Sequence, residues 1–376
     1  MPDVLIVGAG IVGLAHALAA ARRGLSVEVI DRDAQANGAS IRNFGFVTVT
    51  GQERGTVWHR AQRSAEIWRD IAGPAGIALE QSGLLLVAQR AQAAAVIDAF
   101  LGTEMGEACT ALSAAQVQTL CPQVQTAAAG LFSPHDLRVE SRTAVPRLAA
   151  WLEQAHGVVF RRGVSALHME TERLWCSDGE RRASVIILCP GDDGGTLLPH
   201  LFEQAGIARC KLQMLRLADP GWRLPAPVMS DLSMIRYAGY AALPEAAALQ
   251  ARLEQEEVEA LAHGIHLIAV QGADGSLIVG DSHHYAATPD PFASAAVDAA
   301  ILDQYAAVFG PPPKVIERWT GTYASAAGHS IVRTPMDGVR LVVITSGTGA
   351  STAFALAEEV LGDLFDSEGG KPCIPH

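Results

Sequence analysis

The first 31 residues constrain the fold of this chain more than any other stretch. Residues 4–7 are a short apolar run rich in β-branched side chains, which suits a strand buried on both faces. A helix is expected after three glycines in GxGxxG spacing, and a second strand over 25–30 ends in Asp31. The three glycines are Gly8, Gly10 and Gly13.

Each of these residues has a separate role in a nucleotide-binding unit. Gly8 allows the tight turn out of the strand, Gly10 lets a diphosphate approach the backbone, and Gly13 lets the helix pack close to the sheet. The helix start can bind phosphates, and Asp31 lies where a carboxylate can bind ribose hydroxyls. We therefore predict an ADP-binding unit. The alternative is a βαβ unit without a nucleotide, and the stretch alone does not distinguish FAD from NAD.

Composition excludes several other classes of protein. The 376 residues are 49% hydrophobic and 18% charged, which allows two domains, or one domain with a large insertion. A net charge of −12 argues against a nucleic-acid surface, and no apolar run reaches the ~18 residues of a membrane span. The six scattered cysteines predict neither disulfides nor a metal site. We expect a cytoplasmic protein.

The chain also closes on a strand, a glycine turn and a helix, at 339–345, 346–349 and 351–365. Both ends are therefore expected to build one cofactor domain, with the middle of the chain inserted. In the middle, strands are expected over 212–217 and around residues 236–240, and a long helix over 244–263.

Taken in order, these motifs resemble the glycine oxidase, sarcosine oxidase and D-amino acid oxidase flavoproteins over essentially the whole chain. The segments that carry the resemblance are GAGIVG at 8–13, Asp31-Arg32, GAS at 38–40, VVFRRGVSAL at 158–167, CPG at 189–191 and TSGTGAST at 345–352. The resemblance implies an α/β fold: a Rossmann-type, glutathione-reductase-like FAD-binding domain with an inserted mixed-sheet substrate domain. The predicted boundaries are 1–80, 137–208 and 320–376 for the FAD domain, and 81–136 and 209–319 for the substrate domain.

The same resemblance implies non-covalent FAD and assigns residues to it. The pyrophosphate would lie at the glycine turn, the flavin near 42–46, and the turn at 347–352 on the pyrimidine side, while the backbone of Val164 would bond the adenine. For the loop at 33–48 the alternative is a plain surface loop. The FAD residues so implied are Gly8, Gly10, Ile11, Val12, Gly13, Asp31, Arg32, Ala39, Ser40, Arg42, Asn43, Phe44, Val164, Gly191, Gly347, Gly349, Ala350, Ser351 and Thr352.

A narrower similarity points to a subgroup found alongside phosphonate-degradation enzymes, whose members are thought to oxidise N-alkylated aminophosphonates. Its segments are SIRNFGFV at 40–47, LQMLR at 212–216, VGDSHHY at 279–285 and WTGTY at 319–323. Three departures from the wider family matter. The substrate-clamping arginine after the WxG turn is absent, Ile278 stands where sarcosine oxidases carry an oxygen-activating lysine, and no cysteine lies between Cys210 and Cys373 to attach the flavin.

Seven residues are candidates for substrate binding: Arg42, Arg236, Tyr237, Tyr240, His283, His284 and Tyr323. Arginine suits an anion through its planar donor fork, and Tyr323 can bond an anion without adding charge. Only one of the paired histidines is expected to face inward, and the sequence does not tell which. The alternatives are a surface arginine with core tyrosines, and two surface histidines. His329 and Arg333 lie in a loop that either closes the pocket or is plain surface.

The predicted reaction is FAD-dependent oxidation of a small amine, here an aminophosphonate such as an N-methylated aminoethylphosphonate. Hydride would leave the carbon next to nitrogen for flavin N5, the imine would be hydrolysed, and O2 or another acceptor would reoxidise the flavin. No catalytic residue is assigned. The alternatives are a glycine, sarcosine or D-amino acid oxidase or dehydrogenase, a hydroxy-acid oxidase, an NAD-dependent dehydrogenase, and a non-catalytic flavin protein. No oligomeric state is predicted.

Overall fold

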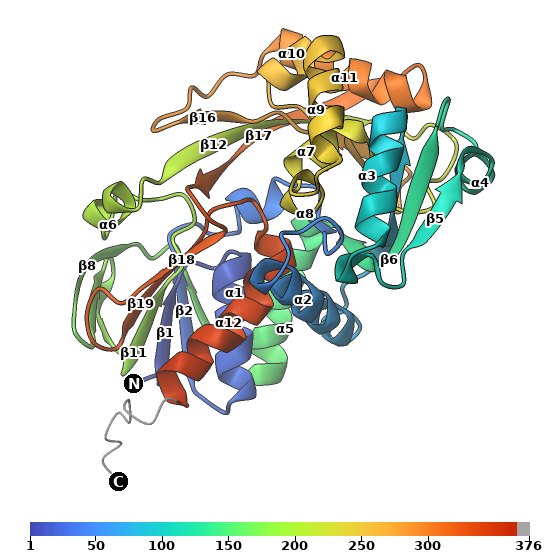
Figure 1. Cartoon of the computed structure of the whole chain (residues 1–376). Helices are drawn as coiled ribbons and strands as arrows, with labels where there is room; N and C mark the ends of the chain where they lie inside the picture. Colours follow the sequence, from blue (N-terminus) through green and yellow to red (C-terminus); the bar gives the residue numbers. More distant parts are fainter. Residues whose placement is uncertain (367–376) are drawn as a thin grey trace.

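The computed structural model describes residues 1–366, which form two layered halves, each built around one sheet (Figure 1). The first sheet has six strands, and its five strands from β19 to β7 are parallel while β18 runs antiparallel to β19. In spatial order they are β18 (Ser330–Arg333), β19 (Val339–Ile344), β11 (Val185–Leu188), β1 (Val4–Val7), β2 (Val27–Asp31) and β7 (Val159–Arg162).

Helices pack on one face of this sheet and a small antiparallel sheet covers the other. In β1, Val4 and Ile6 belong to the hydrophobic core on the helical side, whereas Leu5 packs with Leu174 on the opposite side. The predicted two-sided burial of the first strand is therefore confirmed. The helices are α1 (Ile11–Arg22), α2 (Thr56–Ala72), α5 (Ser141–His156) and α12 (Gly349–Phe365), and the small sheet holds β8 (Ala166–Glu170), β9 (Arg173–Cys176) and β10 (Gly179–Arg182).

The second half is built on a ten-stranded mixed sheet. Its strand β13 pairs parallel with β4, and its other pairs are antiparallel. The main order is β16 (His284–Ala286), β12 (Ala208–Leu217), β15 (Leu277–Gly280), β14 (Ile268–Gln271), β13 (Val228–Met229), β4 (Leu79–Ala88), β6 (Ala129–Val139) and β3 (Phe46–Val47), with β17 (Val315–Ser325) on β12 and β5 (Thr110–Ser113) on β6.

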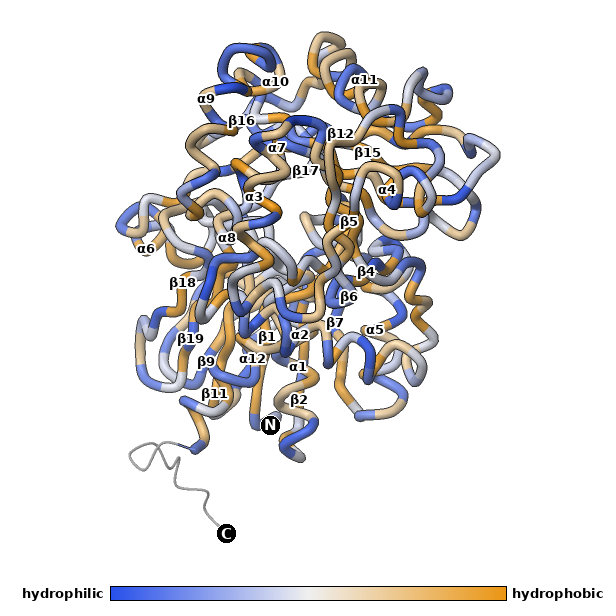
Figure 2. Tube along the Cα trace, turned by 45° about the vertical axis from the view of Figure 1, so that its right-hand side comes forward, coloured by the Kyte–Doolittle hydropathy of each residue, from blue (hydrophilic) through white to orange (hydrophobic). Residues whose placement is uncertain are grey.

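Most of the remaining helices surround this second sheet. Figure 2 shows hydrophilic residues gathered on the outer helices α9 and α10, whereas hydrophobic residues dominate the inner strand β11. These helices are α3 (Ala91–Leu101), α4 (Ala114–Leu120), α6 (Pro199–Gln204), α7 (Asp231–Arg236), α8 (Ala238–Ala241), α9 (Ala246–Glu256), α10 (Val258–Ala262) and α11 (Ala295–Phe309), with 3-10 turns η1 (Ala39–Ile41) and η2 (Glu104–Gly106).

The prediction of a strand around residues 236–240 is wrong, because this segment is largely helical. Arg236 ends α7, Tyr240 lies in α8, and Tyr237 between them has an extended backbone. The first turn of α7 is fixed by Asp231, whose carboxylate accepts from the Gln89 backbone N–H at 2.8 Å. That long-range contact favours a helix that local propensity does not reveal.

The single helix expected over 244–263 is divided into α9 and α10 at Glu257. The Glu257 carboxylate accepts from Arg90 at 2.6 Å and from Gln304 at 2.7 Å. These two partners, distant in sequence, hold the residue in a backbone conformation outside the helical region.

A buried carboxylate joins the two halves. Asp136 on β6 is fully buried, and its oxygens accept from the Val49 and Thr50 N–H groups at 2.7 and 3.1 Å and from two hydroxyls. The neighbouring Thr48 N–H donates to Ser351 Oγ on α12 at 2.9 Å. Segment 48–50 is therefore fixed on one side to the second sheet and on the other to the first half.

The predicted fold class, a Rossmann-type α/β domain with a mixed-sheet second domain, is confirmed. Strands of the six-stranded sheet come from residues 4–31, 159–188 and 330–344, so both ends of the chain build it, as expected. The numerical domain boundaries stay a prediction.

We predict that Gly13→Ala destabilises the protein, because a Cβ at this position would lie 1.9 Å from the Gly8 carbonyl oxygen. Helix α1 must then move away from the sheet, which we expect to lower the free energy of unfolding by roughly 1–3 kcal/mol. Denaturant unfolding measures the change. Gly73→Ala is the matched control, since Gly73 has a helical φ of −60° and open space around its Cβ position. Equal stability of the two variants would contradict this explanation.

Candidate active site

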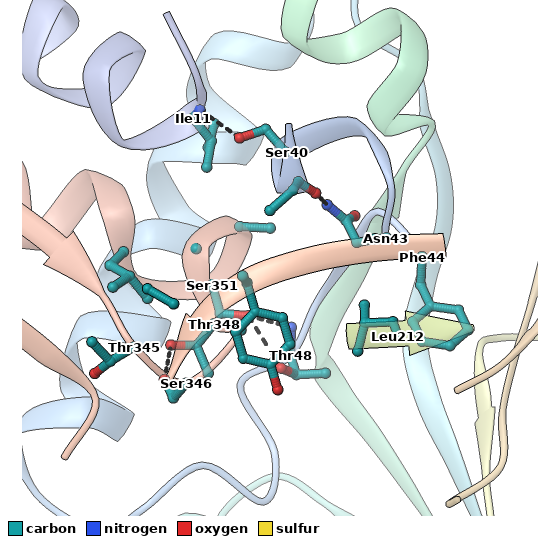
Figure 3. Close-up of a pocket in the computed structure, with 18 of the residues that line it drawn as sticks. Ile11, Ser40, Asn43, Phe44, Thr48, Leu212, Thr345, Ser346, Thr348 and Ser351 are labelled. Carbon is teal, nitrogen blue, oxygen red and sulfur yellow. Dashed lines mark hydrogen bonds between the residues drawn. The ribbon is translucent and has the colours of Figure 1, made fainter. Parts of the chain in front are cut away.

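The glycine turn after β1 leaves no room for side chains. Gly8 has a φ of +105°, and a Cβ there would lie 2.4 Å from the Cys189 carbonyl oxygen. Beside it, Ser40 Oγ accepts from the Ile11 N–H at 2.9 Å, at the first turn of α1 (Figure 3). The other N–H groups of this turn have no partner inside the helix, so the turn and the Ser40 hydroxyl together can hold a diphosphate.

Asp31, at the end of β2, stabilises the glycine turn after β1. The Asp31 carboxylate accepts from the Ala9 N–H at 2.6 Å and from the Asp33 N–H at 2.8 Å. Its backbone carbonyl accepts from the Val164 N–H at 2.9 Å, while Arg32 forms an ion pair with Asp193. The structure thus gives Asp31 a role in bracing the glycine turn, which the sequence did not suggest.

A cavity of about 490 Å³ runs from the α1 turn to the start of α12 and on to strands β12 and β17. Twelve of the nineteen predicted FAD residues line it: Ile11, Val12, Ala39, Ser40, Arg42, Asn43, Phe44, Gly191, Gly347, Gly349, Ala350 and Ser351. Seven do not line it: Gly8, Gly10, Gly13, Asp31, Arg32, Val164 and Thr352. The three glycines and Asp31 shape the turn next to the cavity.

The start of α12 forms the opposite wall. Gly347 has a φ of +72°, and a Cβ there would lie 3.3 Å from the Tyr323 ring. Trp68 Nε1 donates to the Ala350 carbonyl at 2.8 Å, and Ser351 accepts from Thr48, as drawn in Figure 3. Helix α12 has no side-chain cap, and Gly349 and Ala350 in its first turn line the cavity, so this helix start can bind an anionic group.

The structure brings together five of the seven predicted substrate residues. Arg42, Arg236, Tyr237, His283 and Tyr323 line the cavity. Tyr240 does not, because it is fully buried against Phe100 with ring centroids 4.7 Å apart. His284 also lies outside it and contacts His263 at 3.2 Å, so His283 is the inward-facing member of the pair.

Of the two candidates in the loop before the last strand, one lines the cavity and the other does not. His329 lines the cavity and pairs with Glu53 at 2.8 Å, whereas Arg333 is exposed on β18 away from it. The WxG segment, expected in a turn, lies inside strand β17.

Among the cavity residues that the sequence analysis did not assign to the site are His266, Asp281 and Tyr285. Asp281 follows the buried strand β15 directly, which is a common position for a functional acid and could have been noticed. Burial raises the pKa of Asp281 to about 7, against the opposing charge of Arg236. Burial and the Arg236 charge hold the pKa of His266 and of His283 well below the usual value.

The residues present fit a bound FAD. The cavity offers two helix starts for anionic groups, glycines where a Cβ would fill the space, and an apolar passage between them. None of the cysteines among residues 1–366 lines it, and Cys373 lies outside the described residues.

Residues 3–361 match the family model described as DAO, FAD-dependent oxidoreductase. The chain belongs to this family. The match confirms the predicted cofactor and the predicted class of enzyme, an FAD-dependent oxidoreductase. A search of curated protein sequences found no match.

Solved structures of related architecture support the fold. Glycine oxidase from Bacillus cereus ATCC 14579 superposes with a TM-score of 0.78 at 15% identity, covering 99% of both chains. Glycine oxidase from Geobacillus kaustophilus gives 0.76 at 15% identity, covering 100% of this chain and 96% of that one. Iminodiacetate oxidase from Chelativorans sp. BNC1 gives 0.72 at 19% identity, covering 99% and 97%.

None of the helices within residues 1–366 is both long enough and apolar enough to span a membrane.

We predict that Ser40→Ala weakens FAD binding roughly 5- to 30-fold, the equivalent of about 1–2 kcal/mol. The substitution removes the oxygen that accepts from the Ile11 N–H at the α1 turn. Titration of apoprotein with FAD, followed by flavin fluorescence, measures the change. Ser177→Ala is the control, because Ser177 Oγ also accepts a backbone N–H, that of Ser165, but outside the cavity. Equal affinities of the two variants would remove Ser40 from the cofactor site.

Proposed function

We propose that this protein uses FAD to oxidise a small amine that carries an anionic group, with N-alkylated aminophosphonates as the favoured class. The observation that carries the proposal is Arg236. Its guanidinium borders the cavity and donates to the Tyr285 hydroxyl at 3.1 Å. No carboxylate among residues 1–366 forms an ion pair with it at salt-bridge distance.

A cation in this position needs an anionic partner. The Arg236 side chain is exposed to solvent and lines the cavity. A substrate phosphonate or carboxylate would supply a counter-charge to this guanidinium through two parallel hydrogen bonds.

The position of Arg236 also accounts for the missing family arginine. Tyr323 lies on β17 where the resemblance implies a clamp, and both Tyr323 and Arg236 line the same cavity. Arg236 on helix α7 would then supply the positive charge that strand β17 lacks. This change supports a substrate whose anion is placed differently from the α-carboxylate of an amino acid.

These positions assign separate roles to the cofactor and to the residues of the cavity. FAD, when bound, supplies the hydride acceptor for the carbon next to nitrogen. Arg236 with Tyr285 binds the anionic end, in the same cavity that the start of α12 lines. The product imine would be hydrolysed to an aldehyde or keto product.

Two points of the proposal remain alternatives to be tested. The names of the similar glycine and iminodiacetate oxidases support an amine donor with a carboxylate, so glycine, sarcosine and D-amino acids form the second class. The acceptor of electrons is O2 or another oxidant. Ile278 is buried on β15, and Lys211 pairs with Asp290 away from the cavity, so no lysine of residues 1–366 lines the site to assist O2.

We predict that one class of amine bleaches the flavin under anaerobic conditions, and that N-methyl-aminoethylphosphonate does so faster than sarcosine, glycine or D-alanine. The measurement is flavin absorbance after mixing with each compound. If no amine bleaches it, the enzymatic proposal fails. If only carboxylated amines do, the second class replaces the first.

We also predict that Arg236→Met raises KM for the reactive amine roughly 10- to 100-fold, because a charge-assisted hydrogen bond contributes about 1.5–3 kcal/mol. FAD content should stay unchanged. Arg223→Met is the matched control, since Arg223 is exposed and donates only to the backbone carbonyls of Gly272 and Ala273. An unchanged KM for Arg236→Met would show that the anion binds elsewhere.

A further inference from the structure

Three side chains that the proposed function does not use converge at one corner of the cavity. His266 precedes β14, and Asp281 and His283 follow β15, so the antiparallel pairing of these strands brings them together. His266 Nε2 lies 3.3 Å from Asp281 Oδ1, and His283 Nε2 lies 3.6 Å from Asp281 Oδ2. The two imidazole rings are stacked with centroids 5.4 Å apart.

The partners of the other ring nitrogens fix the tautomer of each histidine. His283 Nδ1 lies 2.9 Å from the Gly264 carbonyl, so this nitrogen must carry a proton and donate it. Ser233 Oγ donates to the Leu267 carbonyl at 3.2 Å, and the same hydroxyl is therefore the acceptor for His266 Nδ1, also at 3.2 Å. Both Nε2 atoms consequently present lone pairs when the rings are neutral.

Two lone pairs thus face one carboxylate that is itself an acceptor. Asp281 Oδ1 is buried and has no hydrogen-bond partner among residues 1–366, although His266 Nε2 is its neighbour. The lone pairs of the two Nε2 atoms and the carboxylate oxygens repel one another because no hydrogen lies between them. One proton bound to the cluster would replace this repulsion by a hydrogen bond between a histidine Nε2 and the carboxylate.

The charges around the cluster favour a proton over a metal ion. Arg236 on α7 acts on all three groups, and Tyr237 and Cys210 are the other titratable side chains that interact with Asp281. A divalent cation added beside the arginine would face strong repulsion in this buried corner. A single proton adds less charge, and the raised pKa of Asp281, about 7, is suited to exchanging it near neutral pH.

We propose that His266, Asp281 and His283 form the acid–base group of the enzyme, which accepts the proton of the substrate ammonium before the C–H bond is oxidised. The step breaks one N–H bond, leaves the electron pair on nitrogen, and places the proton on the Asp281 carboxylate, shared with a histidine Nε2. Nothing is oxidised or reduced in it. The inference rests on the proposed function, because it requires an amine.

The arrangement matches a zwitterionic substrate. Arg236 offers a positive site for the anionic group, and the cluster offers a proton acceptor for the ammonium group in the same cavity. An amine must lose its proton before it can release hydride, and an alkylamine in water does so only near pH 10.4.

The test is the pH dependence of anaerobic flavin reduction by N-methyl-aminoethylphosphonate, or by the amine that the substrate panel selects. In the wild type we expect the rate to rise through an ionisation near neutrality and then level off, because the deprotonated cluster is the active form. In Asp281→Asn that ionisation should be lost. The rate should fall roughly 100-fold at pH 7 and recover to within about tenfold near pH 10, where the free amine is abundant.

Three results would overturn the proposal: a wild-type pH profile in Asp281→Asn, an equal loss of rate at every pH, or one equivalent of transition metal per chain by mass spectrometry. If Asp281→Asn does not bind FAD, His283→Gln gives the same test, with a smaller expected shift. Asp290→Asn is the control, since this exposed acid pairs with Lys211 outside the cavity. Failure of every amine in the panel would instead overturn the proposed function, so the two failures are distinguishable.

Discussion

The hydrogen bonds around segment 48–50 hold the active site together. Asp136 fixes the Val49 and Thr50 backbone from the second sheet, while Ser351 at the start of α12 fixes Thr48 from the first half. The cavity lies between these two attachments, and residues from both halves line it. A fully buried carboxylate is costly unless its oxygens are satisfied, and here backbone and hydroxyl donors satisfy both.

The cofactor half was predictable because its information is local. The strand, glycine turn and helix at each end of the chain are each formed by contiguous residues. Their spacing predicts both the strand–turn–helix geometry and the dinucleotide ligand. By contrast, residues 231–241 form helices because Asp231 contacts Gln89, which is distant in sequence. Propensity alone could not reveal that contact, so the positions of Arg236 and Tyr240 were assigned to the wrong element.

The acid–base cluster escaped prediction for a related reason. His266 and Asp281 become neighbours only through the register of β14 on β15, in which Ile268 pairs with Gly280. Neither residue lies in a recognisable motif with the other, and a lone histidine near a strand is usually structural. The predicted His283 was found because it lies beside His284, but its partners could not be named without the register.

The contribution of both chain ends to one cavity also has a consequence for biosynthesis. Helix α1 and its turn are synthesised well before α12, which completes the cofactor wall. The βαβ unit therefore has no complete FAD pocket, and its sheet lacks β18 and β19, until residues 330–365 have been synthesised. Assembly of the whole FAD site therefore requires α12 to pack against α1, a contact between two segments that are distant in the sequence.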